Sequence, residues 1–478
     1  MTWLRNTLIA LGLVAAAPAL AQGPTPADLD TRVQASLRPD VQNVLIVSDT
    51  GKGYATNDNK IIEHGEDPIL HAVALITGPD GDLYLSDTDS LKIDGEAIPQ
   101  DRIFPFPDNF SAAWFRVESD SRGKWYNNSS RDWMWDHWEP LDYAETPLGK
   151  GLSIKADVAP TILDPIYQDG EAVGTMRFSL VLCDGETFYE TPGSNSRHQG
   201  GVSEDVHRIA KKGDTGNDII DNAYALCNNP YIWASNTTTG SEFDNQAEHF
   251  VGADCADFAV AASRLAGFEG LPYAGSMTLD GYTDFVVRPR SSGNIEGTFV
   301  DEEGNSIPIG EDGVKIGDFV LYHRHAALLA EDRSDPYGIL DGRPNGVLDE
   351  HDLVIHTLFA EPRLQPITDY NPKFTIRRQR KDQRAAQEGD VFDLAGHIDA
   401  ILTYSNGMAR SSELAARMGL TEITDANNLE IGDKIFIPPN YSPDKFTWVV
   451  YTVKEGDSMT EIARRAVKGT LVDYKPNE

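Results

Sequence analysis

An alanine-rich run that starts three residues after Cys255 is the feature that most constrains the fold of this 478-residue chain. The run extends from Phe258 to Ala266 with small apolar side chains at helical spacing, and Gly267 follows it as a stop signal. We therefore expect a buried helix that starts near Cys255. In its first turn, unpaired backbone N–H groups and the positive end of the helix dipole favour a thiolate, the nucleophilic form of cysteine. Cys255 is thus a candidate nucleophile, with a buried inert thiol as the alternative.

Two later segments carry histidines in strand-like surroundings. Residues 317–330 contain two apolar runs separated by His323-Arg324-His325, which predicts a pair of strands. Residues 352–359 form a third apolar run with His356 near its centre. A cysteine, a histidine and a third polar group that orients the imidazole are the groups needed to activate a thiol.

The order of these pieces resembles that of the NlpC-type cell-wall peptidases, which are papain-like cysteine enzymes. The family pattern is Pro-Tyr-x-Trp, Asp-Cys at a helix start, Gly-Asp, a His before a small apolar strand, and a second His. The matching pieces of this chain are Pro230–Trp233, Asp254-Cys255, Gly317-Asp318, His325 and His356. The resemblance implies cleavage of amide bonds in the stem peptides of peptidoglycan.

The same resemblance implies a role for each matched residue. Cys255 is the nucleophile, His325 the general base, His356 the orienting residue, and Tyr231 a helper beside the thiolate. The distances along the chain, 70 residues from Cys255 to His325 and 31 from there to His356, exceed the family habit. His323 is therefore a rival base, since strand alternation places it on the same face as His325.

The residues around the cysteine also depart from the family pattern. Ala256-Asp257 stands where the family has Ser-Gly. The Asp257 carboxylate either lies in the site or faces solvent, and the rarity of buried charges favours solvent.

Two other functions stay open. The stretch from Gly252 to Ala259 also resembles transglutaminase-like cysteine enzymes, whose Cys–His–Asp triad performs acyl transfer or amide hydrolysis. That alternative needs an aspartate after the histidine, for which Asp349 and Asp352 are available. A third candidate is a wall-binding protein whose degenerate hydrolase domain only holds the stem peptide.

The start of the chain and its charge indicate an exported protein that does not bind nucleic acid. Met1–Ala21 has a lone arginine, an apolar core and a terminal A-x-A pattern, which predicts a cleaved signal peptide and a periplasmic or secreted location. Elsewhere in the sequence, no apolar stretch approaches the length of a membrane span. The net charge of −34 disfavours contact with phosphates.

We expect an α+β multidomain fold. After the signal peptide and a linker at 22–35, short strands and turns predict a β-rich sandwich or barrel over residues 36–205. Within it, Trp133–Trp138 either stack on sugar rings or pack in a core. The resemblance implies a papain-like α+β domain over 206–372, and a basic linker follows at 373–396.

The C-terminal part resembles LysM glycan-binding modules, which are small βααβ units. Residues 448–465 match the first strand, the Gly-Asp turn and the first helix, and Ser458 and Glu461 form a capping box. The segment 397–440 is either a divergent second module or the missing half of the partial module at 447–478. The resemblance implies that this part binds the glycan of peptidoglycan.

The remaining candidate sites concern cysteines and calcium. Cys183 and Cys227 either pair in a disulfide that leaves Cys255 free, or all three thiols are separate. No cofactor is required by the expected chemistry, but one loop has oxygen ligands at spacing typical of an EF-hand, with Gly346 at the sharp turn. The candidate calcium ligands are Asp341, Asn345, Asp349 and Asp352. A plain polar loop is the favoured alternative, because Arg343 occupies a ligand position.

Overall fold

The computed structural model describes most of residues 40–380 and shorter stretches between 401 and 465. The gaps before residue 381 lie at 79–80, 122–125, 128–140, 199, 236–242, 292–296, 323 and 334–342. The predicted signal peptide, the linker at 22–35 and the tryptophan cluster therefore lie outside the described residues, as do His323 and Asp341.

The predicted α+β fold class is wrong, because the described chain is built mostly of strands. The α-helices whose bounds lie within the described residues are the short α3 (Asp218–Ala225) and α4 (Cys255–Leu265). These do not make a papain-like α+β domain, and the C-terminal part shows only isolated helical positions such as 401–402 and 462–463 rather than complete LysM helices. The error has a physical cause: short motifs fix the geometry of a site but not the class of the long segments between them, and those segments form strands here.

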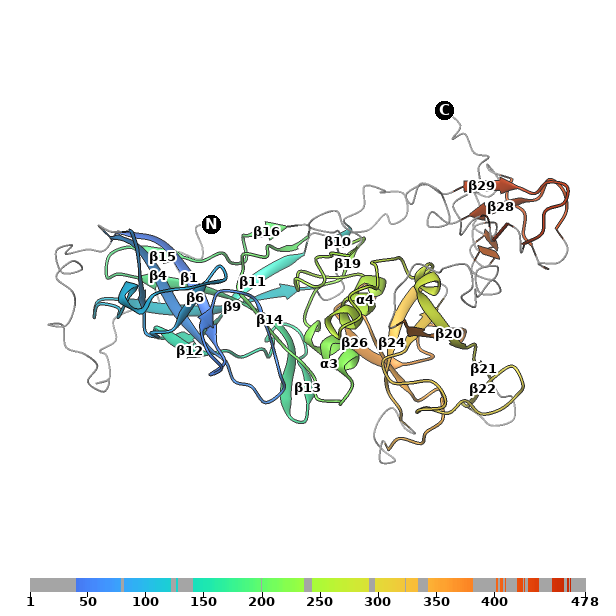
Figure 1. Ribbon diagram of the computed structural model, residues 1–478, viewed down its shortest axis with the longest axis horizontal. Helices are drawn as coiled ribbons and strands as arrows, with labels where there is room; N and C mark the ends of the chain where they lie inside the picture. Colours follow the sequence, from blue (N-terminus) through green and yellow to red (C-terminus); the bar gives the residue numbers. More distant parts are fainter. Residues whose placement is uncertain are drawn as a thin grey trace.

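Two β-sheets pack face to face in the N-terminal region (Figure 1). The first has the order β7-β6-β2-β1-β4-β5-β8, with β12 paired to β4. Its strands are β1 (Val41–Asp49), β2 (Ala55–Thr56), β4 (Ile69–Gly78), β5 (Gly81–Ser86), β6 (Leu91–Ile93), β7 (Glu96–Ala97), β8 (Ile103–Phe104) and β12 (Ser153–Lys155). Gln100–Arg102 form a 3₁₀ turn before β8.

The second sheet has the order β11-β9-β14-β18-β3, with β13 and β15 paired to β14. Its strands are β3 (Lys60–Ile62), β9 (Ser111–Asp120), β11 (Asp142–Lys150), β13 (Ile166–Gln168), β14 (Glu171–Cys183), β15 (Phe188–Glu190) and β18 (Arg208–Lys211). Alternate residues of the long strands, including Val44 and Ile46 of β1 and Phe178 and Leu180 of β14, form the core between the sheets. Burying these apolar side chains is the main stabilisation of this region.

An antiparallel six-stranded sheet carries the later part of the chain, in the order β20-β27-β23-β24-β25-β26. Its strands are β20 (Thr283–Val287), β23 (Phe319–Tyr322), β24 (His325–Glu331), β25 (Leu353–His356), β26 (Arg363–Pro366) and β27 (Thr375–Gln379). Alternate residues of β24 face opposite cores: Ala326 and Leu328 face the helices, whereas Ala327 and Leu329 face the other side. Helices α3 and α4 lie between this sheet and the N-terminal sheets (Figure 1).

Strand β27 occupies the start of the predicted basic linker at 373–396. Arg377 is buried and donates to the Thr283 side chain and backbone carbonyl. Arg378 forms two hydrogen bonds with the carboxylate of Asp318, at 2.8 and 2.7 Å. These two arginines therefore hold the sheet together, while residues 381–396 lie outside the described part.

Buried hydrogen bonds join β14 to the loop that follows α3. The backbone N–H of Thr175 donates to the carbonyl of Cys227 at 2.9 Å. The fully buried Arg177 donates to Asn229 and to the carbonyl of Phe250. This network fixes the segment 226–250 against the N-terminal sheet.

Three short strand pairs and one 3₁₀ turn complete the description of residues 40–380. The pairs are β10 (Tyr126–Asn127) with β19 (Ile232–Trp233), β16 (Arg197–His198) with β17 (Gly201–Val202), and β21 (Arg290–Ser291) with β22 (Phe299–Val300). The 3₁₀ turn is η4 (Leu279–Tyr282).

In the C-terminal part, β28 (Lys434–Ile437) pairs antiparallel with β29 (Val449–Thr452). Ile423 and Ile435 from the first predicted segment share a core with Tyr451, Val453 and Ile462 from the second. The two segments thus share one apolar core in the described part of the chain.

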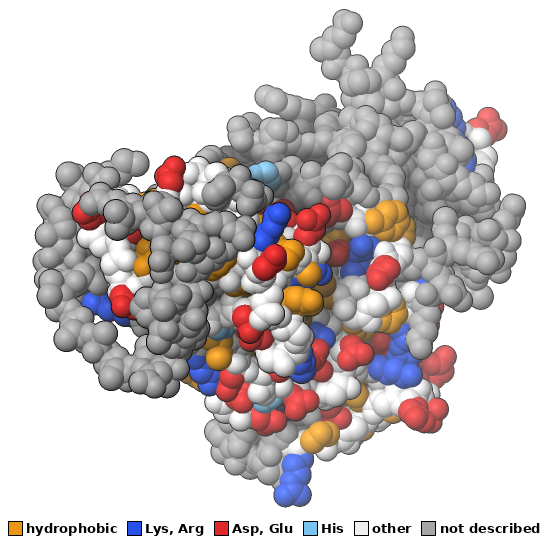
Figure 2. All heavy atoms as spheres, turned by 60° about the vertical axis from the view of Figure 1, so that its left-hand side comes forward, with side chains coloured by type: hydrophobic (Ala, Val, Ile, Leu, Met, Phe, Trp, Pro, Cys, Tyr) orange, Lys and Arg blue, Asp and Glu red, His pale blue; other side chains and the backbone are white. Residues whose placement is uncertain are grey.

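No helix in the described part of the chain is long and apolar enough to span a membrane. Figure 2 shows acidic and basic side chains interspersed over one face of the molecule, with apolar side chains in small separate groups. The described residues of this face form no large surface of a single charge.

Candidate functional site

The first residue of α4 is Cys255, as the sequence predicts. Asp254 caps the helix: its carboxylate accepts hydrogen bonds from the backbone N–H groups of Ala256 at 3.0 Å and Asp257 at 3.1 Å. Only 4% of Cys255 is exposed. The cap therefore fixes the thiol at the helix start, inside the protein.

A short backbone strap places Tyr231 beside this thiol. Ile232 donates to the carbonyl of Ala253 at 3.1 Å, and Ala253 donates to the carbonyl of Pro230 at 3.3 Å. Gly252 permits this approach, because a Cβ atom there would lie 2.4 Å from Cδ1 of Ile232. Tyr231 is fully buried. Burial raises the pKa of its hydroxyl, and the negative charge of a Cys255 thiolate would raise it further.

The two predicted histidines meet across neighbouring strands. His325 begins β24 and His356 ends β25. Nε2 of His325 lies 2.7 Å from Nδ1 of His356, and the ring centroids are 4.7 Å apart. Nε2 of His356 in turn lies 2.6 Å from Oε1 of Gln365, which stands on β26. Both imidazoles are buried.

The thiol and the histidine pair meet at the start of β24. The backbone N–H of Ala326, the residue after His325, acts on the Cys255 thiol as a hydrogen-bond donor and lowers its pKa. No hydrogen bond joins the thiol directly to an imidazole among the described residues. The structure therefore brings Cys255 to the strand that begins at His325, with a backbone N–H rather than an imidazole bound to the thiol.

Burial decides the protonation state of Cys255. Removal from water raises the pKa of the thiol well above its usual value, and the negative charges of Asp254 and Asp257 raise it further. The N–H groups of Ala326 and Ala256 act in the opposite direction but are outweighed. The expectation of a thiolate stabilised by the helix start is thus wrong for this closed site.

Asp257 does not face solvent, contrary to the favoured expectation. It is 8% exposed, and its carboxylate accepts hydrogen bonds from the side chains of Ser235 and Asn245. Burial and the neighbouring Asp254 raise its pKa well above the usual range. It is a buried carboxyl in the first turn of α4, held by its own hydrogen bonds.

Both histidines of the pair are neutral at neutral pH. Burial lowers the pKa of His325 to about 2 and that of His356 to about 4. The positive charge of Arg363, the cross-strand neighbour of His356, lowers both pKa values further. A neutral imidazole has a lone pair that can accept a proton, as a general base must.

Sequence reasoning missed two residues of this site. Gln365 completes the hydrogen-bonded row behind the histidines. Tyr370, which is 40% exposed, has its ring centroid 4.6 Å from that of His325. Partial burial raises the pKa of Tyr370, and the nearby Cys255 thiol raises it further. The signal for Gln365 was its place in β26. It pairs with Val354, which is two residues before His356 and therefore on the same face of β25. Tyr370 lies in a loop and offered no such signal.

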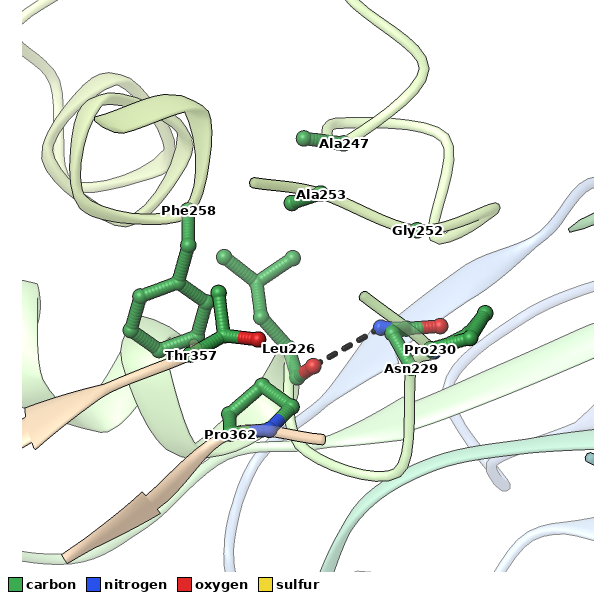
Figure 3. A pocket seen from close by; sticks show the side chains of 9 residues that line it. All are labelled: Leu226, Asn229, Pro230, Ala247, Gly252, Ala253, Phe258, Thr357 and Pro362. Atoms are coloured by element: carbon green, nitrogen blue, oxygen red, sulfur yellow. Dashed lines mark hydrogen bonds between the residues drawn. The ribbon is translucent and has the colours of Figure 1, made fainter. Parts of the chain in front are cut away.

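A small apolar cavity lies beside the site, between the start of α4 and the end of β25. Figure 3 shows that the side chains of Leu226, Phe258, Thr357 and Pro362 line it, with Ala253 at its edge. Its volume is about 10 Å³, at the lower limit for one water molecule. A substrate therefore does not enter through this cavity.

Three of the six described non-glycine residues with positive φ lie in segments that adjoin the site. Ala234, Phe250 and Phe359 have φ values of 51°, 56° and 50°, in the left-handed region that residues other than glycine rarely adopt. The N–H of Ala234 donates to Asp254, and the ring of Phe359 contacts that of Tyr231 at 5.2 Å. Such strain is typical of functional sites, where the surrounding structure enforces it.

The predicted disulfide does not form. Cys183 and Cys227 are both free. Cys227 adjoins Thr175 on β14, whereas Cys183 ends that strand eight residues later. This separation is roughly 26 Å at 3.3 Å per strand residue, far beyond the reach of a disulfide.

The carboxylates of the predicted calcium loop bind the loop's own groups. Asp352 accepts from the N–H of Asp349 at 2.7 Å and from that of Arg333 at 3.0 Å. Asp349 accepts from the Asn345 side chain at 2.6 Å. No cluster of three or more metal-binding side chains occurs in the described residues. Calcium binding stays a prediction without structural support.

Comparison of the chain with models of known protein families, with curated proteins and with solved structures found no match. Functional argument therefore rests on the residues and their geometry.

Proposed function

We propose that this protein is an exported cysteine hydrolase that cleaves amide bonds, with Cys255 as nucleophile and His325 as general base. One observation carries the proposal: the row His325–His356–Gln365 ends beside a buried thiol at a helix start. The transglutaminase-like alternative is less well supported, because Nε2 of His325 contacts His356, while Asp349 and Asp352 are engaged within their own loop.

In the closed site, burial lowers the pKa of His325 and raises that of the Cys255 thiol, so both shifts oppose proton transfer. The proposed chemistry therefore takes place when water or substrate enters the site. His325 accepts the thiol proton as the sulfur of Cys255 attacks the amide carbonyl. The C–N bond then breaks, the amine leaves with that proton, and a thioester remains on Cys255. Water, deprotonated by His325, attacks the thioester and releases the carboxylic acid and the free thiol. The backbone N–H of Cys255 is the proposed donor to the oxyanion.

The proposed substrate is the stem peptide of peptidoglycan. Support for this substrate comes from the ordered NlpC-type motifs in the sequence and from the predicted signal peptide. We propose that the C-terminal segment, whose sequence resembles glycan-binding modules, holds the protein on the wall.

Binding without catalysis is the second candidate, and the burial of the site favours it. Cys255 is 4% exposed and His325 is fully buried. In this alternative, the site stays closed and the protein only holds wall polymer.

The deciding experiment is digestion of purified sacculi by the mature protein, with fragments identified by mass spectrometry. We expect stem-peptide fragments from the wild type and none from Cys255→Ala. Cys183→Ala is the matched control, because that thiol lies on β14 and does not take part in the site. Pelleting of the wild type with sacculi, without fragments, would support the binding function instead.

A further inference from the structure

We propose that Gln365 is a positioning residue that determines which ring nitrogen of His325 acts as the base. The inference rests on the proposed cysteine hydrolase and extends it by one residue. Gln365 lies on β26, is partly buried, and directs Oε1 at Nε2 of His356 at 2.6 Å.

The amide oxygen of Gln365 fixes the proton on His356. A carbonyl oxygen accepts hydrogen bonds and cannot donate them, so Nε2 of His356 must carry the hydrogen. Because burial and Arg363 keep the His356 ring neutral, its Nδ1 then bears a lone pair.

The same logic passes on to His325. The lone pair on Nδ1 of His356 lies 2.7 Å from Nε2 of His325 and can only accept, so this Nε2 carries the hydrogen of the second ring. His325 is also neutral. Its Nδ1 therefore bears the lone pair that a general base requires.

Nδ1 of His325 is the ring nitrogen left over for the thiol. It is buried and has no hydrogen-bond partner among the residues that the structure describes. Nδ1 is the ring nitrogen nearer the backbone, and the thiol of Cys255 meets the backbone N–H of the next residue, Ala326. A buried polar atom without a hydrogen-bond partner lowers stability and therefore calls for an explanation. Accepting the thiol proton would be that explanation.

The opposite orientation of the Gln365 amide would disable the base. Its NH₂ group would donate to Nε2 of His356, which would place hydrogens on Nδ1 of His356 and then on Nδ1 of His325. The latter could not accept a proton from Cys255. Gln365 thus acts on the reaction through two imidazoles without touching the substrate.

The test is nitrogen NMR of the full-length protein labelled with ¹⁵N-histidine, since the ring nitrogens report directly which of them is protonated. His325→Gln and His356→Gln variants assign the signals. We expect hydrogen on Nε2 of both rings in the wild type and a mixture of tautomers in Gln365→Met, which has a similar length but no acceptor. Turnover on sacculi should fall at least about tenfold in this variant, as is common when a supporting hydrogen bond is lost.

Gln379→Met is the matched control. Gln379 is a buried glutamine on β27 of the same sheet, and its NH₂ group donates to Ser263 and to the carbonyl of Gly317. Its loss should leave both tautomers unchanged.

A hydrogen on Nδ1 of His325 in the wild type overturns the inference, as does an unchanged tautomer pair in Gln365→Met. The wild-type spectrum alone suffices if that variant does not fold. Because the spectrum needs no turnover, failure of the inference is separable from failure of the proposed hydrolase, which shows as the absence of cysteine-dependent fragments from sacculi.

Discussion

Two buried histidines in different regions of the molecule look alike but have different surroundings. His207, which precedes β18 in the N-terminal sheets, is 7% exposed, and burial lowers its pKa to about 4. His325 in the six-stranded sheet is fully buried, and its pKa falls to about 2 for the same reason. Each ring also has one buried nitrogen without a hydrogen-bond partner in the described part of the chain.

The partners of these two rings differ. Nδ1 of His207 lies 3.3 Å from the backbone carbonyl of Asn57, which can neither move a proton nor take part in chemistry. Nε2 of His325 contacts a second imidazole, and the backbone N–H of the next residue, Ala326, binds the Cys255 thiol. Burial and a lowered pKa therefore do not identify a functional histidine by themselves, whereas the chemistry of its neighbours does.

The largest effect should come from making the same substitution at both positions. His325→Gln should lower turnover on sacculi by roughly 10³-fold, equivalent to about 4 kcal/mol in the activation free energy. His207→Gln should leave turnover per folded molecule unchanged, because the hydrogen-bond contact of that ring in the described part of the chain is the backbone carbonyl of Asn57. Initial rates at matched folded concentrations decide the matter, and equal losses in both variants would remove the distinction drawn between the two histidines.

The helix start around Cys255 could be predicted because its signals are local. The Asp254 cap and the alanine-rich run act within one helix, and the structure begins α4 at Cys255. His325 and His356 were found because each lies in a short apolar run, and β24 and β25 pair. Local patterns thus located all three proposed catalytic residues.

What sequence reasoning missed depends on contacts between distant segments. The raised pKa of the Cys255 thiol results mainly from its burial, which the local sequence around the helix start does not record. Gln365 reaches His356 only because the register of β26 on β25 pairs Gln365 with Val354, two residues before His356. The fold class was wrong for the same reason, since the spacing of motifs does not record how the intervening segments pair.

An intermediate effect should appear in the pH dependence of stability. The folded pKa of His207 is lowered to about 4, below the roughly 6.5 of an exposed histidine. At pH 5 the unfolded chain therefore binds a proton there that the folded chain does not, and stability falls as the pH falls. Between pH 7 and 5, the free energy of unfolding of the wild type should drop by about 2 kcal/mol relative to His207→Gln.

Chemical denaturation of both proteins at each pH measures this difference. Comparison with the variant is essential, because Asp352 has a folded pKa raised to about 8 and contributes a slope of the opposite sign. If the difference between the two proteins is the same at pH 7 and pH 5, His207 is not buried in its neutral form. His325→Gln should show a shift of the same sign. The two histidines should therefore affect the pH dependence of stability alike, although only His325 should affect turnover.

The smallest effect concerns access to the site and should separate the two rings again. Tyr370 is the exposed ring that covers His325, at 4.6 Å between centroids, and it is an electrostatic neighbour of Cys255. Removing the ring in Tyr370→Ala should admit water, relieve part of the desolvation that raises the thiol pKa, and speed alkylation of Cys255 by about tenfold at pH 8.

Tyr370→Phe keeps the ring and is the matched control, so its alkylation rate should stay near that of the wild type. Mass spectrometry of the peptide that contains Cys255 distinguishes its alkylation from that of Cys183. An unchanged rate in Tyr370→Ala would mean that another element closes the site. An increased rate would show that a single loop side chain keeps the thiol buried and protonated. The ring of His207, by contrast, contacts a backbone carbonyl.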